Sequence, residues 1–493
     1  MSKRQAEEEH NGDSALKQGE RPVATADDAE MGQFEDDYED EFESEDEIMV
    51  AGADGEPDEE EGGQENGIDK MEVDQQTFIP GRHKLDAGQV LAPDPSTYEM
   101  LHSLEAPWPC LSFDVLQDQL GDGRARKKYP ATVYAVAGTQ AAQGHDKENE
   151  ILVLKLSKLA KMDRPEEESE DEDDDDDENT DPILETRGIR IGTCTNRIRA
   201  HQKSSDDPSK PATTYTAAMT ESGQVLIHDI TPHLTSFDTP GFALDPQSNQ
   251  PIHTIKAHKK DEGYAVAWSH ASQPTRRLLT GDTRGNIFCT TQNADGTWTT
   301  DPKPFTGHKG SVEELEWSPT EANVFASASS DGTIKIWDTR SKAHRPALSV
   351  KASEHDINVL SWSHKTAHLL ASGDDAGQWA VWDLRQWKPN TKPSPVASFN
   401  FHKEQITSVE WHPSDDSIVA VCAGDNTLTL WDLAVELDDE ESQYTADVKD
   451  VPPQLLFVHY MEQVKECHWH PQAPGQLMAT GGSGFGVFKT ISV

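Results

Sequence analysis

The stretch that decides the fold is Gly307-His-Lys-Gly-Ser-Val-Glu-Glu-Leu-Glu-Trp-Ser-Pro319, followed by Phe325-Ala-Ser-Ala-Ser-Ser-Asp-Gly-Thr-Ile-Lys-Ile-Trp-Asp338. Apolar and polar residues alternate near its end, as in a strand with one buried face, and the Asp-Gly pair is typical of a hairpin turn. Similar blocks begin at His355 and His402, and the closing tryptophans of the three blocks are 45 and 49 residues apart. The spacing predicts a repeat protein made of short strands.

These words and this period resemble the WD40 repeat, in which each repeat forms one four-stranded blade of a β-propeller. Weaker copies lie at 191–230, 257–290 and 459–491, and strand-like runs fill 111–156. We therefore expect an all-β fold, a seven-bladed WD40 β-propeller over residues 110–493. Seven blades close the ring and leave few exposed sheet edges.

The family's buried hydrogen-bonding tetrad maps onto four residues of the first block: His308, Ser327, Asp331 and Trp337. The resemblance implies a structural role for them, not a catalytic one. In the next two blocks Ala376 replaces the turn aspartate and Val421 replaces the serine. We expect those two blades to lose polar bracing and to keep their apolar cores.

The negative charge is concentrated in two tracts. The chain carries 90 acidic and 43 basic side chains, a net charge of −47, of which residues 1–80 hold −23 and residues 163–181 hold −13. Like charges repel and apolar residues are sparse there, so we expect residues 1–78 to be a disordered acidic arm. The tract 163–181 is predicted as a solvated acidic loop between two strands.

The composition excludes several classes of protein. An acidic chain repels phosphates, which disfavours direct binding to nucleic acid or to anionic membranes and favours a basic partner. No apolar run approaches the roughly 18 residues that span a bilayer, and the N-terminus lacks the apolar core of a signal peptide. The 5 cysteines have no zinc spacing, which indicates reduced thiols in an intracellular protein. We expect a monomeric non-enzyme without cofactor or metal.

Residues 79–109 are predicted as a linker and a short N-terminal helix near 94–105, which two prolines stop. Tyr98, Leu101 and Leu104 recur at i, i+3 and i+6, and on a helix they would form one apolar stripe. A second feature, the acidic Pro-Pro loop 436–454, precedes the last repeat.

The segments Trp108-Pro-Cys-Leu-Ser-Phe-Asp114, Tyr129-Pro-Ala-Thr-Val-Tyr134 and Ala137-Gly-Thr-Gln-Ala141 resemble the glutamate-rich WD-repeat proteins, assembly factors for the large ribosomal subunit. The resemblance implies a non-enzymatic acidic chaperone for a basic ribosomal protein, the third protein of the large subunit. It also implies a place in the nucleus and nucleolus, with indirect contact to pre-ribosomal particles.

The layout is more distantly similar to histone-binding subunits of chromatin complexes, in which an N-terminal helix and an acidic Pro-Pro loop hold a basic histone helix. A histone-binding chaperone is therefore an alternative function. This resemblance implies partner-binding residues in the two corresponding segments: Tyr98, Leu101, Leu104, Asp438, Asp439, Glu440, Glu441, Asp450, Pro452 and Pro453.

Three short motifs remain. Arg340 and Arg385 follow Trp-Asp pairs and resemble docking sites for the adaptor of a cullin-four ubiquitin ligase, so a substrate receptor of that ligase is a further alternative. Ser44 and Ser169 lie in the same Glu-Ser-Glu-Asp-Glu word and resemble sites of a casein-kinase-two-type kinase, where phosphate adds about −1.5 to −2 charges. The basic run 124–128 is either a nuclear import signal or a charged turn.

Overall fold

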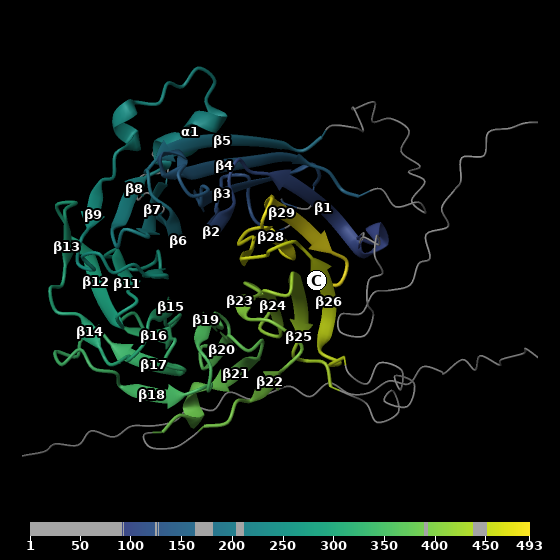
Figure 1. Cartoon of the computed structure of the whole chain (residues 1–493). Coiled ribbons are helices and arrows are strands. Elements are labelled where there is room, and N and C mark those ends of the chain that lie inside the picture. The colour runs from purple at the N-terminus through teal and green to yellow at the C-terminus, as the bar shows by residue number, and fades with distance from the viewer. Residues whose placement is uncertain are drawn as a thin grey trace, which may run out of the picture. The chain divides into compact units, whose positions relative to one another are not determined.

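The computed structural model describes residues 91, 93–123, 126, 128–162, 181–203, 212–388, 393–436 and 451–493. These residues form seven antiparallel sheets set around a central channel, which confirms the seven-bladed propeller (Figure 1). The apolar cores lie within and between neighbouring blades. None of the helices among the described residues is long and apolar enough to span a membrane.

The blades follow one another along the chain. Blades 1 to 3 contain β2 (Cys110–Leu116), β3 (Ala131–Thr139), β4 (Glu150–Leu159) and β5 (Ile183–Arg190); β6 (Thr195–Lys203), β7 (Thr213–Thr220), β8 (Val225–Asp229) and β9 (His253–Ile255); and β10 (Ala265–Trp268), β11 (Arg277–Gly281), β12 (Asn286–Gln292), β13 (Trp298–Thr300) and β14 (Phe305–Thr306). Blades 4 to 6 contain β15 (Val312–Trp317), β16 (Val324–Ser329), β17 (Thr333–Asp338) and β18 (Leu348–Lys351); β19 (Ile357–Trp362), β20 (Leu369–Asp374), β21 (Trp379–Asp383) and β22 (Ala397–Phe399); and β23 (Ile406–Trp411), β24 (Ile418–Ala423), β25 (Thr427–Asp432) and β26 (Leu455–Tyr460).

Blade 7 joins the two ends of the propeller. It contains β27 (Glu466–Trp469), β28 (Gln476–Thr480), β29 (Gly484–Thr490) and, as its outer strand, β1 (Tyr98–Glu105). β1 runs antiparallel to β29 (Figure 1). The ring is thus closed by hydrogen bonds between strands from opposite ends of the sequence.

The predicted N-terminal helix is therefore wrong, and the propeller begins by Tyr98 rather than at residue 110. Only a single turn of 3-10 helix, Pro95–Thr97, precedes β1, and Asp94 caps it by accepting from Ser96 N at 3.0 Å. Without β1, the edge of β29 would leave backbone groups unpaired, and a sheet edge is a strong template for a strand. Tertiary pairing thus overrides the local helix signal.

One α-helix is present among the described residues, α1 (Thr231–Asp238), between β8 and β9. Its last residue, Asp238, accepts from Tyr134 Oη at 2.9 Å and from Lys155 Nζ at 2.7 Å. These contacts attach the helix to β3 and β4 of blade 1.

Two of the acidic segments lie in equivalent connections. Neighbouring strands are antiparallel, so the first and third strands of each blade run the same way and end at one face, which we call the lower face. The acidic loop 163–181 follows the third strand of blade 1, and the loop 436–454 follows the third strand of blade 6. β1 begins at the same face, because it runs antiparallel to β29.

The structure forms the predicted tetrad of blade 4. Ser327 Oγ accepts from Trp337 Nε1 at 2.8 Å and lies 2.6 Å from His308 Nε2. The other ring nitrogen, His308 Nδ1, lies 3.1 Å from the Asp331 carboxylate. All four side chains are thus joined in one chain of hydrogen bonds.

The expectation that blade 6 loses its bracing is wrong. Val421 has no hydroxyl, but Thr429, which pairs with it on the next strand, supplies one. Thr429 Oγ1 accepts from Trp431 Nε1 at 2.7 Å and lies 3.1 Å from His402 Nε2. The same tryptophan and histidine are therefore satisfied from a different strand.

Blade 5 is also braced, by a shifted aspartate. Asp374 lies two residues before Ala376 and accepts from the Ala376 backbone N–H at 3.1 Å. Its second carboxylate oxygen accepts from Ser353 Oγ at 2.6 Å, and Ser372 Oγ accepts from Trp382 Nε1 at 2.8 Å. Aspartate and serine thus take the places that Asp331 and His308 have in blade 4.

His228 on β8 makes stability depend on pH. The side chain is 1% exposed, neither ring nitrogen has a hydrogen-bond partner, and burial, with a smaller repulsion from His233, lowers its pKa to about 4. In the unfolded chain a histidine titrates near pH 6.5. The unfolded state therefore binds more protons between these values, and His228 removes about 3 kcal/mol of stability as the pH falls through this window.

We expect His228→Leu to remove that contribution, so that the free energy of unfolding falls less steeply with decreasing pH than in the unaltered chain. Denaturant titrations over this pH range measure it. His355→Leu, at an exposed position, serves as the matched control. Equal pH slopes for the unaltered chain and His228→Leu would contradict the assignment.

Candidate functional site

A half-buried apolar surface lies where blades 6 and 7 meet at the lower face. We call it the rim patch; its residues are Leu101, Met162, Leu456 and Phe457, all packed against the core shared by the two blades. Leu101 comes from β1, and Leu456 and Phe457 come from β26, whereas Met162 lies just beyond the end of β4 in blade 1. Three distant parts of the chain thus contribute to one surface.

Tyr98 fixes the base of the rim patch. Its ring packs edge-on against Phe457 at 5.2 Å between centroids, and its hydroxyl lies 2.8 Å from His459 Nδ1. Tyr98 is 3% exposed, and burial raises its pKa. The tyrosine therefore links β1 to β26 and is not itself a free contact surface.

The root of the acidic loop 163–181 is tied to β1. Met162 N donates to Glu99 O at 3.0 Å, and His102 Nε2 lies 2.8 Å from Ala160 O. The Glu99 carboxylate in turn accepts from Tyr129 Oη at 3.0 Å and pairs with Lys489 Nζ at 2.8 Å. This acidic tract therefore starts beside the rim patch.

The loop 436–454 returns to the same place. Leu455 N donates to Pro452 O at 3.0 Å, and Gln454 joins both sides of the loop by donating to Val435 O at 2.9 Å and accepting from Asp432 N at 2.8 Å. Residues 437–450 between these ends contain six acidic side chains and one basic one. Acidic sequence thus adjoins the rim patch from both neighbouring blades.

The structure separates the residues of the predicted apolar stripe. On a strand, Leu104 faces blade 1 and is 6% exposed, and Tyr98 is buried as described, so neither offers a contact surface. Leu101 remains half-buried in the rim patch, and Pro452 and Pro453 are half-buried beside it. Of the remaining predicted residues, the following lie outside the described residues: Asp438, Asp439, Glu440, Glu441, Asp450, Ser44 and Ser169.

Sequence reasoning did not single out Met100, Met162, Phe457 or His459. Tyr98, Met100 and Leu104 are the buried residues of β1, and the even spacing of 98, 100 and 104 is a strand signal. The helical spacing of Tyr98, Leu101 and Leu104 hid it.

The predicted adaptor-docking arginines lie at the lower ends of blades 4 and 5. Arg340 forms a two-pronged ion pair with Asp338, with nitrogen–oxygen distances of 2.9 and 2.7 Å, and Arg385 forms the same pair with Asp383 at 3.0 and 2.8 Å. Both arginine side chains are more than half exposed. Each arginine therefore braces its own turn and remains accessible.

In the basic run 124–128, Arg126 has a structural role. Its guanidinium pairs with Asp118 and donates to Gly121 O at 3.1 Å and to Thr132 O at 3.0 Å. The pair is almost fully buried. This favours the charged turn, because a receptor for an import signal needs exposed basic side chains.

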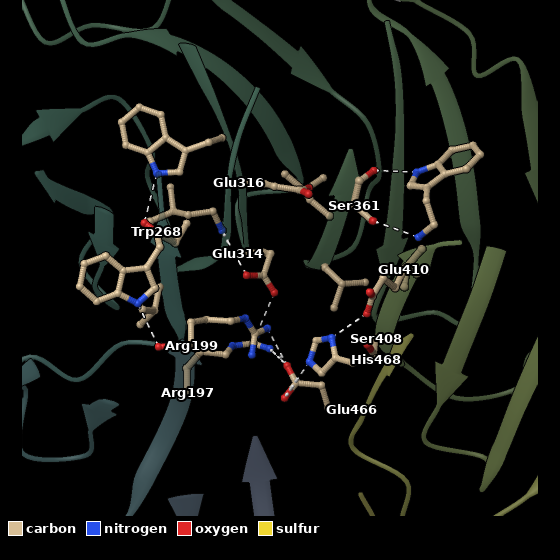
Figure 2. A pocket seen from close by; sticks show the side chains of 18 of the residues that line it. Arg197, Arg199, Trp268, Glu314, Glu316, Ser361, Ser408, Glu410, Glu466 and His468 are labelled. Carbon is tan, nitrogen blue, oxygen red and sulfur yellow. Dashed lines mark hydrogen bonds and ion pairs between the residues drawn. The ribbon is translucent and has the colours of Figure 1, made fainter. Parts of the chain in front are cut away.

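The central channel holds a network of buried charges (Figure 2). Glu466 Oε1 accepts from Arg197 and from Arg199, each at 2.7 Å, and its other oxygen accepts from Phe113 N at 2.9 Å. Arg197 also pairs with Glu314 at 3.0 Å. One carboxylate thus ties blades 1 and 2 to blade 7 across the channel wall.

Neighbouring charges set the ionisation of this network. Burial alone would raise the pKa of Glu466, but Arg199, His468 and Arg197 hold it well below its usual range. Burial alone would lower the pKa of His468, but Glu410 at 2.6 Å and Glu466 at 3.6 Å raise it well above the usual value. The channel therefore contains a protonated histidine between two carboxylates.

The described part of the chain contains no group of three or more histidine, cysteine, aspartate or glutamate side chains placed to hold a metal ion. The described cysteines are unpaired, and burial raises the pKa of Cys110 to about 12. A thiol with so high a pKa is a poor nucleophile. The described residues thus offer surfaces and ion pairs.

Comparisons with known proteins agree with this architecture. Residues 88–160 match the family described as histone-binding protein RBBP4 or its counterpart in the CAF1 complex, and residues 300–338 and 393–432 match the WD domain, G-beta repeat. The chain is 45% identical to ribosome assembly protein rrb1 of Schizosaccharomyces pombe, over 100% of both chains.

Two further relatives are similar over most of their length. Protein HEAT STRESS TOLERANT DWD 1 of Arabidopsis thaliana is 42% identical over 84% of this chain and 91% of its own. Glutamate-rich WD repeat-containing protein 1 of Dictyostelium discoideum is 39% identical over 83% of this chain and 84% of its own. The chain therefore belongs to the family of WD-repeat proteins that includes ribosome assembly protein rrb1 and the glutamate-rich WD-repeat proteins.

Proposed function

We propose that the protein is a non-enzymatic assembly factor of the nucleus and nucleolus that chaperones a basic protein of the large ribosomal subunit, the third protein of that subunit. The observation that carries this is the meeting of acidic sequence from blades 1 and 6 at the rim patch. Apolar side chains on an otherwise polar surface mark a binding site, and the surrounding charge selects a basic partner. The name of the relative rrb1 supports the ribosomal assignment.

In this mechanism the rim patch and the acidic tracts have different tasks. Burying one leucine side chain of the patch against the client contributes about 1.5–3 kcal/mol and fixes the position of the bound segment. Each solvent-exposed ion pair contributes only about 0–1 kcal/mol. The many carboxylates instead raise the association rate and cover the RNA-binding surface of the client, with a strong dependence on salt.

Release follows from the same electrostatics. Ribosomal RNA carries a high density of phosphates, and basic proteins bind it with the release of condensed counterions. When the client reaches its RNA site, these phosphates displace the carboxylates. The chaperone therefore needs no energy source, because the more strongly charged polyanion takes over the client.

A histone-binding chaperone is the second candidate, and the match of residues 88–160 to the histone-binding family model favours it. That range contains β1 and the root of the acidic loop, so both candidates use the same surface. A substrate receptor of a cullin-four ligase is the third, supported by the exposure of Arg340 and Arg385. An adaptor complex that stays intact after both arginines are changed to alanine would exclude it.

The double variant Leu101→Ser/Leu456→Ser tests the proposal. Loss of two apolar contacts is expected to weaken binding of the ribosomal client at least about tenfold. Leu348→Ser is the matched control, because Leu348 is a half-buried leucine on the outer strand of blade 4. Titration of the purified client against each variant measures the affinity. Unchanged affinity for the double variant, with folding intact by thermal denaturation, would exclude the rim patch as the binding site.

A further inference from the structure

The central channel contains a cavity that is continuous with the lower face. The inner cavity has a volume of about 280 Å³, and a second one of about 330 Å³ shares wall residues Trp268, Glu410 and His468 with it. The second cavity is also lined by Gln117 and Pro471, which follow the ends of first strands, so it lies toward the lower face. Its mouth thus opens on the face that carries the acidic loops.

The walls carry more negative than positive groups. Five carboxylates, Asp114, Glu314, Glu316, Glu410 and Glu466, face two arginines and the protonated His468. The ion pairs engage three of the five: Glu466 and Glu314 with arginine, and Glu410 with His468. Asp114 accepts from Ala200 N at 2.8 Å and has Arg199 nearby. Glu316 is left without an ion pair.

Glu316 projects from β15 into the channel and stands apart from the ion pairs drawn in Figure 2. It accepts from the backbone N–H of Trp362, but its Oε2 atom is shielded from water and has no hydrogen-bond partner. An unpartnered buried carboxylate oxygen costs free energy. Burial, with Glu314 and Glu410, raises the pKa of Glu316 well above its usual value.

We propose that the channel binds one basic side chain, the lysine or arginine of a protein partner, against Glu316 and Glu410 at the inner cavity. This extends the proposed function, because it assumes the same basic class of partner. The cavity is slightly smaller than the about 300–1,000 Å³ of small-molecule pockets and suits a single side chain. Entry is from the lower face, so a client held at the rim patch has its flanking residues on the side of the channel mouth.

Binding of the cation is coupled to loss of a proton. Glu314 on the same strand, Glu410 on β23 and Arg199 on β6 act on Glu316, and His364 and His468 line the same cavity. In the free protein the acidic neighbours and burial favour the uncharged acid. An ammonium or guanidinium group favours the carboxylate, so Glu316 releases its proton to solvent on binding.

The probe is a short glycine–serine peptide with a single arginine, and its matched control carries the uncharged citrulline instead. Titration calorimetry of the full chain in buffers of different ionisation enthalpy counts the protons released. The unaltered chain is expected to release protons on binding, whereas Glu316→Gln releases none and binds about tenfold more weakly. Glu354→Gln, at an exposed glutamate outside the channel, should behave as the unaltered chain.

Peptide that binds only to the acidic tracts gives a different result, because carboxylates already ionised release no proton. Proton-free binding that is equal in the unaltered chain and Glu316→Gln would overturn the channel site and leave the proposed function standing. The free amino acid amide of arginine, used as a third probe, tells whether the channel needs a side chain on a peptide. Proton release with the free amide and not with the peptide would limit the site to small cations and would also overturn the proposal.

Discussion

Glu466→Ala is expected to lower the free energy of unfolding by about 3–5 kcal/mol, the usual cost of removing one partner from a buried ion network. The side chain of Glu466 is 2% exposed and accepts from Arg197, Arg199 and Phe113 N. Its loss leaves two guanidinium groups in the channel without their shared counter-charge. Equilibrium unfolding in denaturant measures the change.

Asp338→Ala provides the comparison, because Asp338 forms an ion pair with Arg340 whose arginine is 66% exposed. Exposed pairs contribute about 0–1 kcal/mol, so this variant should be nearly as stable as the unaltered chain. Replacing Arg197, Arg199 and Glu466 together by methionine should recover most of the stability lost in Glu466→Ala, because no unpaired charge remains. A Glu466→Ala effect no larger than that of Asp338→Ala would contradict the structural role of the network.

Removal of residues 1–78 and 163–181 is expected to slow association with the basic client by roughly 10–10³-fold at low ionic strength. The two tracts carry most of the net charge of −47, and electrostatic steering scales with that charge. Screening shortens the range of attraction to about 8 Å at physiological salt, so the difference should shrink as salt is added. Stopped-flow association at several salt concentrations measures it, and the client should also lose protection from RNA-induced aggregation.

Two variants of loop 163–181 separate charge from sequence. A scrambled loop keeps the charge and should associate as fast as the unaltered chain, whereas a loop of the same length with asparagine and glutamine in place of the acids should be slow. If the neutral loop and the deletion of both tracts leave association and solubility unchanged, the acidic tracts are not the working part. The rim patch alone would then have to account for binding.

The repeat pattern was sufficient to predict the propeller, because alternation and turn residues are local features that recur in each blade. The error at Tyr98–Glu105 shows the limit of that reasoning. The same residues fit a helical stripe and a strand, and the decision lies with β29, nearly 400 residues further along the chain. A count of strands in the last repeat would have shown that the closing blade needed one from the other end.

The bracing of blade 6 shows a second limit. A search at the position of Val421 finds no hydroxyl, yet Thr429 lies opposite it and accepts from the same tryptophan. Only the register of the two strands reveals that the positions are equivalent. The channel network was missed for the same reason, since Arg197, Arg199 and Glu466 meet through closure of the ring and not through any spacing in sequence.

The most direct test of the central claim is cross-linking mass spectrometry of the complex purified from cells, with a reagent that joins carboxylates to lysines. The account predicts that one basic segment of a large-subunit ribosomal protein is linked both to 163–181 and to 436–454, because the two loops adjoin the same rim patch. Links that gather instead on the upper face, for example at Glu354, or that join the two loops to histones alone, would contradict it.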